Sequence, residues 1–298
     1  MAGFSNRWRS NMLSTLTGSD DGRPYWVEKI EQGEDAGYFG PGSAAWAVHG
    51  GIPTMVAGIR SLLLQALHPG AMAGVHDWSR YQEDALGRLS GTVKWLVTVT
   101  YADTTLARAE TVRVGCFHDR VRGTYLDNAG AERSYAAGDP DLLRWVHLVF
   151  ADSFLACHQL WGAPIPGGAD QYVREWATAG ELLGVPNPPR SEAELRDGLD
   201  SFRSELRSDE RVAEVVGFIR NPPLTATMKP AYRILFAGAV ASLPRQYRAM
   251  LGLRRTWLPA ITATRVMLGA IQLALGRTST SEEAAIRRIA RLESAAAR

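Results

Sequence analysis

Four of the six histidines lie in or beside strongly apolar stretches, and they are the side chains best suited to chemistry. They are His68, His118, His147 and His158. On a helix, His118 shares a stripe with small and apolar residues, and His147 shares another with His158. His147 and His158 are eleven residues apart, about 16 Å along an α-helix. They cannot ligate one metal ion together, so any metal centre would take one of them at most.

Arg88 and Thr92 lie one turn apart on a predicted helix face that also carries Trp95 and Val99. Burying an arginine and a threonine on an apolar face is costly unless a polar group meets them. A haem would meet these residues and a histidine together, because its iron takes an imidazole and its propionates pair with arginine. The residues alone leave two interpretations open: a haem pocket, or core histidines hydrogen-bonded to carbonyl groups and a solvated Arg-Thr face.

Several other kinds of site lack their motifs. The sequence contains no His-Glu-x-x-His, no Cys-x-x-Cys, no His-x-Asp/Glu and no Gly-x-Ser-x-Gly. These absences argue against a conventional zinc or non-haem iron site, a covalently attached haem and the commonest hydrolase. The two cysteines, Cys116 and Cys157, are too few for a disulfide framework, and we expect both to be reduced core residues.

Composition narrows the partners. The 298 residues carry 33 basic and 31 acidic side chains, a net charge of +2, which gives no case for nucleic-acid binding. Only three of the basic residues are lysines, namely Lys29, Lys94 and Lys229. Arginine keeps its charge when partly buried and binds carboxylates through two parallel hydrogen bonds. Some of the arginines are therefore expected to face a ligand carboxylate.

Membrane segments are not evident. The N-terminus has no apolar core of a secretory signal. The stretch 257–275 is apolar but contains Arg265 and three other polar residues, so we expect a core helix rather than a membrane span. The sequence predicts a cytoplasmic protein without an integral membrane segment.

The pattern along the chain predicts a mainly α fold. Residues 1–40 are polar and glycine-rich and read as an extended arm, followed by one multi-helix domain over 41–298. A first helix is predicted from Ile52 to the stop at His68-Pro69-Gly70, and three more over 84–101, 104–122 and 140–160. Asp103 is the expected N-cap of the helix over 104–122, and Asp139 that of the helix over 140–160.

Alternation around Asn-Ala-Gly predicts a short β-hairpin over 124–135. Proline-rich breaks then separate further helices over 169–183, 191–207, 230–242 and 258–275. The last stretch, 281–298, is amphipathic. We expect it to dock either on the body of the protein or on a second copy in a homodimer.

Short segments in order along residues 40–155 carry a resemblance to the catalytic domain of the rubber oxygenase (latex clearing protein) family, which includes fungal oxygenases that cleave a farnesyl chain. The matching segments are Gly40-Pro-Gly-Ser43, Trp46-Ala-Val-His49-Gly, Leu63-Leu-Gln-Ala-Leu-His68-Pro-Gly70, Asp84-Ala-Leu-Gly-Arg88-Leu-Ser-Gly-Thr92, Val114-Gly-Cys-Phe-His118-Asp-Arg-Val-Arg-Gly123, Tyr135-x-x-x-Asp139-Pro-Asp-Leu-Leu-Arg-Trp145-Val-His147 and Asp152-Ser-Phe154.

The resemblance implies a haem b protein with a globin-like helical core. It implies that His118 is the proximal iron ligand and that Arg88 and Thr92 belong to the haem pocket. In latex clearing proteins a lysine can occupy the distal iron position, whereas this chain has Gly91 there, which implies an open or water-filled distal side. His147 is a candidate for a distal or supporting role.

The remaining histidines and one arginine have mainly structural interpretations. His68 stands at a helix end before a proline, where a histidine commonly caps the last carbonyl groups. His49 and His76 are expected to be structural or surface groups. Arg122 lies one turn beyond His118 and is suited equally to a propionate or to a surface ion pair.

The function predicted from this evidence is a haem-b-dependent oxygenase that uses O2 on an apolar, unsaturated small molecule, with oxidative cleavage of a carbon–carbon double bond as one reaction. Arg88, Thr92 and His147 are the candidate catalytic residues, and Arg88, Thr92 and His118 the candidate haem-binding ones. The alternative from another class is a helical protein that holds haem or a lipid without catalysis, and a third is a purely structural helical protein.

Overall fold

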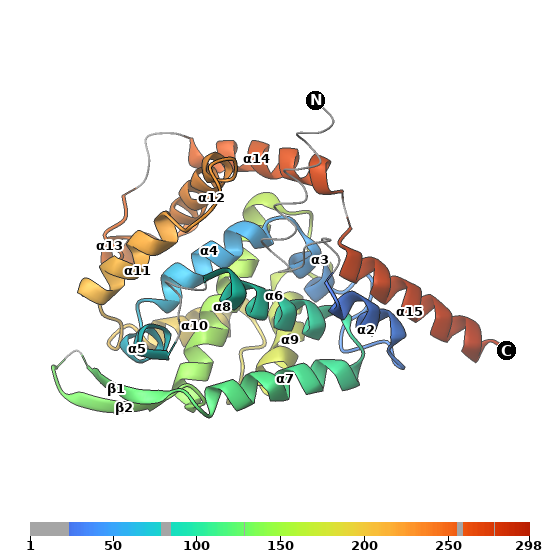
Figure 1. Cartoon of the computed structure of the whole chain (residues 1–298), viewed down its shortest axis with the longest axis horizontal. Coiled ribbons are helices and arrows are strands. Elements are labelled where there is room, and N and C mark those ends of the chain that lie inside the picture. The colour runs from blue at the N-terminus through green and yellow to red at the C-terminus, as the bar shows by residue number, and fades with distance from the viewer. Residues whose placement is uncertain (1–23, 79–84, 128, 255–258, 277) are drawn as a thin grey trace.

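Helices make up most of the computed structural model, which describes residues 24–78, 85–127, 129–254, 259–276 and 278–298 (Figure 1). The prediction of a mainly α fold is confirmed. The helices are α2 (Trp26–Gln32), α3 (Ala44–Gly50), α4 (Thr54–Gln65), α5 (Pro69–Trp78), α6 (Ala85–Tyr101), α7 (Thr104–His118), α8 (Pro140–Trp161), α9 (Gly168–Leu182), α10 (Glu192–Ser201), α11 (Glu210–Arg220), α12 (Lys229–Ser242), α13 (Arg245–Met250), α14 (Ala260–Leu275) and α15 (Thr280–Ala296).

The predicted β-hairpin is also confirmed. Strands β1 (Arg122–Leu126) and β2 (Glu132–Ala136) pair antiparallel, with Thr124 opposite Ser134. The strands explain why α7 ends at His118, four residues before the predicted end at 122. Extended backbone begins at Arg122 and cannot continue a helix.

Two of the predicted N-caps behave differently. The Asp103 carboxylate accepts a hydrogen bond from the Leu106 amide at 2.9 Å, which confirms it as the cap of α7. Asp139 precedes α8 in extended conformation, but its side chain makes no cap hydrogen bond. Its carboxylate accepts instead from the Ala136 amide at 2.7 Å, which ties the end of β2 to the start of α8.

Residues 24–40 are not the extended arm that the sequence predicted. Helix α2 lies within them and buries Trp26, Val27 and Ile30 against α15 and α6. A seven-residue helix between polar, glycine-containing segments is too short for a clear helical period. The described part of the predicted arm therefore belongs to the folded body.

Helices α4 and α8 cross at the centre of the core, and one buried ion pair joins them. The Arg60 guanidinium of α4 is 2% exposed and lies 2.6 Å from the Asp152 carboxylate of α8. It also donates to the Ser153 hydroxyl at 2.9 Å. Helices α3, α9, α10 and α12 pack around this pair. Arg60 thus fixes α4 against the helix that carries His147.

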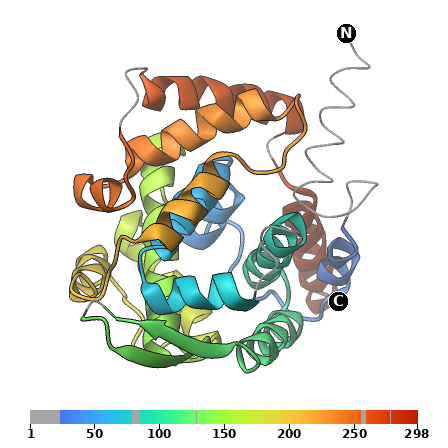
Figure 2. The same ribbon diagram turned by 60° about the vertical axis from the view of Figure 1, so that its left-hand side comes forward.

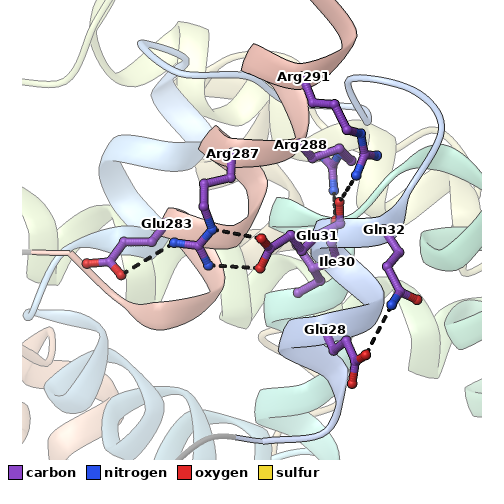
Figure 3. A network of polar contacts seen from close by, with 8 residues as sticks. All are labelled: Glu28, Ile30, Glu31, Gln32, Glu283, Arg287, Arg288 and Arg291. Carbon is purple, nitrogen blue, oxygen red and sulfur yellow. Dashed lines mark hydrogen bonds and ion pairs between the residues drawn. The ribbon is translucent and has the colours of Figure 1, made fainter.

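Helix α15 packs against α2 at the opposite end of the molecule from the β-hairpin, and three arginines make the joint (Figure 3). The Arg287 guanidinium binds both carboxylate oxygens of Glu31 at 2.9 Å. Arg291 donates to the Gly33 carbonyl at 2.6 Å. The amphipathic C-terminal stretch therefore docks on the body of the protein.

Arg288 is the buried member of this set, with no exposed surface. Its guanidinium donates to the backbone carbonyl groups of Ile30 at 2.7 Å, Ala36 at 3.2 Å and Tyr101 at 2.8 Å. Tyr101 is the last residue of α6. One side chain of the C-terminal helix therefore holds α2, the loop that follows it and the end of α6.

Replacing Arg288 with alanine should destabilise the protein by about 3 kcal/mol, because buried carbonyl groups would lose charged hydrogen-bond donors. Arg287→Ala is the matched control on the same helix. Its ion pair is half-exposed, so we expect a loss of at most about 1 kcal/mol. Urea unfolding followed by circular dichroism measures both. Equal losses in the two variants would contradict the assignment of Arg288 as the main tie.

Candidate functional site

Helices α6 and α7 form a hairpin that carries the predicted haem-binding residues. Only Ala102 and Asp103 separate the two helices, which pack along each other (Figures 1 and 2). Arg88 lies thirteen residues before the end of α6 at Tyr101, and His118 lies fourteen residues after the start of α7 at Thr104. With equal rise per residue, these two positions stand at the same level, at the open end of the hairpin.

The root of this hairpin is held rigidly. The Asp35 carboxylate accepts from the backbone amide and the hydroxyl of Thr104, at 2.9 and 2.5 Å. The Asp103 carboxylate accepts from the Glu34 amide at 3.0 Å. Gly37 has φ 85°, and a Cβ on it would collide with the Ala102 carbonyl oxygen. The chain that follows α2 therefore closes on the turn between α6 and α7.

At the open end, His118 is half-buried as the last residue of α7, and Thr92 is exposed on α6. The Arg88 backbone belongs to α6, whereas its side chain lies outside the described part of the structure. Among the described residues no group of three or more His, Cys, Asp or Glu side chains could hold a metal ion. His118 therefore offers a single imidazole, the protein ligand that a haem iron needs.

Two glycines leave the backbone of the hairpin accessible. Gly91 precedes Thr92, and Gly115 lies one turn before His118. Apart from chain neighbours and the backbone of its own helix, no described atom lies within 4 Å of where a Cβ would stand on either one. The backbone at these two positions is therefore uncovered by other described side chains.

Three aromatic side chains form a layer where α6, α8 and α9 meet. The Trp95 ring of α6, the Phe150 ring of α8 and the Trp176 ring of α9 lie with centroids 5.8 to 6.4 Å apart. One helical turn from each of these rings, on the side that points away from α3, stand Thr92 on α6, His147 on α8 and Gly180 on α9. These three therefore lie on the same side of the layer, although no hydrogen bond joins His147 to the hairpin.

His147 is buried on α8 and packs against α9. A Cβ on Gly180 would stand 2.8 Å from its Cε1 atom, so the ring fills the space that this glycine leaves. Burial lowers the pKa of His147 to about 4, and the imidazole is neutral near pH 7. It makes no hydrogen bond with another described residue.

His68 has a different role from the one predicted. Its Nδ1 atom accepts hydrogen bonds from the backbone amides of Gly70 at 3.2 Å and Ala71 at 3.4 Å. It therefore caps the beginning of α5, not the end of α4. The prediction of a C-cap is wrong because Pro69 starts a new helix at once.

His49 and His158 are core histidines, in line with a structural role for His49. The Nε2 atom of His158 lies 2.9 Å from the Ala163 carbonyl oxygen. His49 stands among Phe154, Tyr172 and Trp176, with its Nε2 atom 3.3 Å from the Tyr172 hydroxyl.

Two further sequence expectations have mixed outcomes. The side chain of His76 lies outside the described part of the structure. Cys157 is buried as predicted, but Cys116 is exposed, because the α7 face that carries it has no helix packed on it.

Two surface hollows lie away from the hairpin. One, of about 710 Å³, opens between α8, α9 and α10, with Arg144, Glu181 and Asp197 in its lining. The other, of about 360 Å³, lies between the β-hairpin, α5 and the start of α11. Neither includes Thr92, His118 or His147. The candidate site is therefore defined by the hairpin and the aromatic layer.

The fold is a helical body in which the α6–α7 hairpin carries the candidate ligand His118 at the end of α7. The sequence model of the family described as ER-bound oxygenase mpaB/B'/Rubber oxygenase, catalytic domain, matches residues 46–273. The chain belongs to this family, and the predicted membership is confirmed. It is an oxygenase-family enzyme, an oxidoreductase. No curated protein and no solved structure matches the chain.

Replacing Gly180 with alanine should push the His147 ring from its place and destabilise the protein by about 1–3 kcal/mol. Gly217→Ala is the control, since that glycine also lies inside a helix but has open space around it. There we expect a gain of about 0.5–1 kcal/mol. Thermal unfolding and the His147 ring signals in NMR report both effects. An unshifted ring signal in Gly180→Ala would contradict this packing.

Stability should fall as the pH drops from 7 to 5. Burial lowers the pKa values of His49 to about 3 and of His68 and His147 to about 4. Below their ordinary pKa of 6.5, the unfolded chain takes up protons that the folded protein refuses. Each histidine should therefore cost about 1–2 kcal/mol of unfolding free energy over this range.

Urea unfolding at pH 7, 6 and 5 measures this slope. His68→Gln keeps a side-chain acceptor at the start of α5 but cannot titrate. The unfolding free energy of this variant should therefore fall less between pH 7 and pH 5, by the contribution of one histidine. A stability that stays constant from pH 7 to pH 5 would show that these imidazoles are not held neutral.

Proposed function

We propose that this chain is a haem-b-dependent oxygenase that acts on an apolar, unsaturated small molecule, with oxidative cleavage of a carbon–carbon double bond as its reaction. The observation that carries the proposal is the α6–α7 hairpin, in which the Arg88 and His118 positions lie at the same level along the helix axes and Thr92 lies one turn from Arg88 on α6. Membership in the oxygenase family supports the reaction class.

Each candidate residue has a role that its position suits. His118, half-buried at the helix end, would hold the iron through one ring nitrogen. Arg88, on the neighbouring helix at the same level, would pair with a propionate. Gly91 and Gly115 keep the helix surfaces free for the ring. When bound, haem supplies an iron that binds and activates O2.

The surroundings would control polarity and access. Trp95 and Phe150 present an aromatic wall that excludes water and suits an apolar substrate. The hydroxyl of Thr92 is on the residue next to Gly91 and would be a hydrogen-bond donor on that side. His147, neutral near pH 7, can donate or accept one hydrogen bond without adding charge. A cytoplasmic location stays a prediction from the sequence.

Haem retention tests the ligand assignment. Protein expressed with a haem supply should show a Soret band, and His118→Ala should lose it because the iron would have no protein ligand. Adding free imidazole to His118→Ala should restore the band. Cys116→Ala, an exposed change two residues away on the same helix, should keep it. A Soret band of full intensity in His118→Ala without imidazole would move the assignment to another residue, with His147 the next to test.

Oxygen consumption separates an oxygenase from a non-catalytic haem or lipid carrier. The haem-loaded protein should consume O2 in the presence of a long-chain polyene and release carbonyl fragments, detected by mass spectrometry. A protein that binds haem and polyene but consumes no O2 with any of a panel of polyenes would favour the carrier.

A further inference from the structure

Helix α14 has no helix over its outer face, although most of that face is uncharged. Its inner face buries Ala260, Thr264, Leu268 and Ile271 against α12 and the core. Its outer face carries one charged residue, Arg265, and five uncharged ones that we call the α14 apolar face: Thr262, Val266, Gly269, Ala270 and Leu273. Val266 is 69% exposed and Leu273 is 90% exposed. An outer helix face in water is normally charged, so this face calls for a cover.

The charges in the sequence on either side of α14 all have one sign. Between Glu214 and Glu282 the sequence contains no acidic residue but nine basic ones. Six of the nine are described and exposed, and we call them the basic cap: Arg220, Lys229, Arg233, Arg245, Arg254 and Arg265. The chain as a whole has a net charge of only +2, so positive charge is concentrated in this stretch of less than a quarter of the chain.

No residue of the basic cap makes an ion pair with a described residue, whereas arginines elsewhere regularly do. Arg190, Arg196 and Arg203, for example, all pair with acids on or next to α9 and α10. Helices α12 and α14 lie side by side at the top of the molecule in Figures 1 and 2, and α11 and α13, which also carry or border the basic cap, lie below them toward the left side in Figure 1. The uncovered apolar helix and the unpaired positive charge therefore occur on the same part of the molecule.

We propose that the α14 apolar face and the basic cap dock on the surface of an anionic lipid bilayer. An apolar helix face that enters the headgroup region, with arginines meeting lipid phosphates, is the chemistry of interfacial helices. No single described helix is long and apolar enough to cross a membrane, and α14 would lie in the plane of the bilayer. A second copy of this chain is a poorer cover, because a symmetric contact would bring two basic caps together.

This docking does not depend on haem. It would place the protein at the lipid bilayer, in which apolar unsaturated molecules dissolve. Co-sedimentation with vesicles measures binding alone. Its failure would therefore leave the proposed oxygenase function untouched.

The test is co-sedimentation of the full chain with lipid vesicles. We expect binding to phosphatidylcholine vesicles containing about one third phosphatidylglycerol, little binding to phosphatidylcholine alone, and release at high salt. The double variant Val266→Asp/Leu273→Asp should bind at least about tenfold more weakly. Its matched control is Leu126→Asp, an exposed apolar residue of the β-hairpin (53% exposed), which should bind like the unaltered protein.

A variant that lacks two arginines tests whether the basic cap contributes to vesicle binding. Arg233→Gln/Arg254→Gln should weaken binding about thirtyfold, from about fivefold for each arginine. The control Arg196→Gln/Arg203→Gln removes two exposed arginines of α10 that already have acidic partners. Circular dichroism and thermal unfolding show whether each variant is folded.

Three outcomes would overturn the proposal. The first is an absence of binding to anionic vesicles. The second is equal binding by the unaltered protein and the folded Val266→Asp/Leu273→Asp variant. The third is a dimer in light scattering that this double variant dissociates, which would make a second copy the cover of the α14 apolar face.

Discussion

The Arg288 guanidinium is the contact on which the arrangement of the candidate site depends. It gathers carbonyl groups from α2, from the loop after α2 and from the end of α6. Around it, Asp35 and Asp103 fasten the first residues of α7, and Gly37 allows the loop to touch the Ala102 carbonyl group. Because α7 packs chiefly on α6, its direction is set at this root. The far end, with His118, inherits its position from contacts about fourteen residues away.

Arginine solves a recurrent problem of this helical fold, which is how to satisfy polar groups inside an apolar body. Arg60 does so between α4 and α8 by pairing with Asp152 and Ser153, and Arg288 does so with backbone carbonyl groups. Both side chains can do so because a planar guanidinium donates in several directions at once. The buried histidines take the opposite course and stay neutral. The interior therefore holds its permanent charge in arginines and leaves imidazoles free to act as hydrogen-bonding groups or ligands.

Sequence reasoning found most of the long helices and missed the short ones, and it also missed α11, which has eleven residues. The apolar stripes of α4, α6 and α8 run for three turns or more, so the helical period is plain. Helices α2, α3 and α13 have seven residues or fewer and no period to detect, and α5 follows α4 too closely to be separated from it. The end of α7 was placed too late because β1 begins at Arg122, two residues before the predicted start of the hairpin, and its pairing with β2 overrides local helix preference.

The candidate site was predictable in part. The spacing of Arg88 and Thr92 and the apolar setting of His118 and His147 are visible in the sequence. Arg88 and His118 lie at the same level because a two-residue turn at Ala102 and Asp103 leaves them at similar distances along the two helices of the hairpin. No local sequence pattern indicates that the two distances match. The contact of His147 with Gly180 and the Trp95, Phe150 and Trp176 layer join helices far apart in sequence. His68 shows the same limit, because its partners belong to the helix that follows.

The position of Arg288 has a consequence for how this protein tolerates genetic change. A single substitution of Arg288 would leave every candidate ligand encoded. Yet it would remove the anchor at the root of the hairpin that carries the imidazole. The codon of Arg288 is thus as exposed to loss-of-function change as those for the site itself, although 170 positions separate Arg288 from His118.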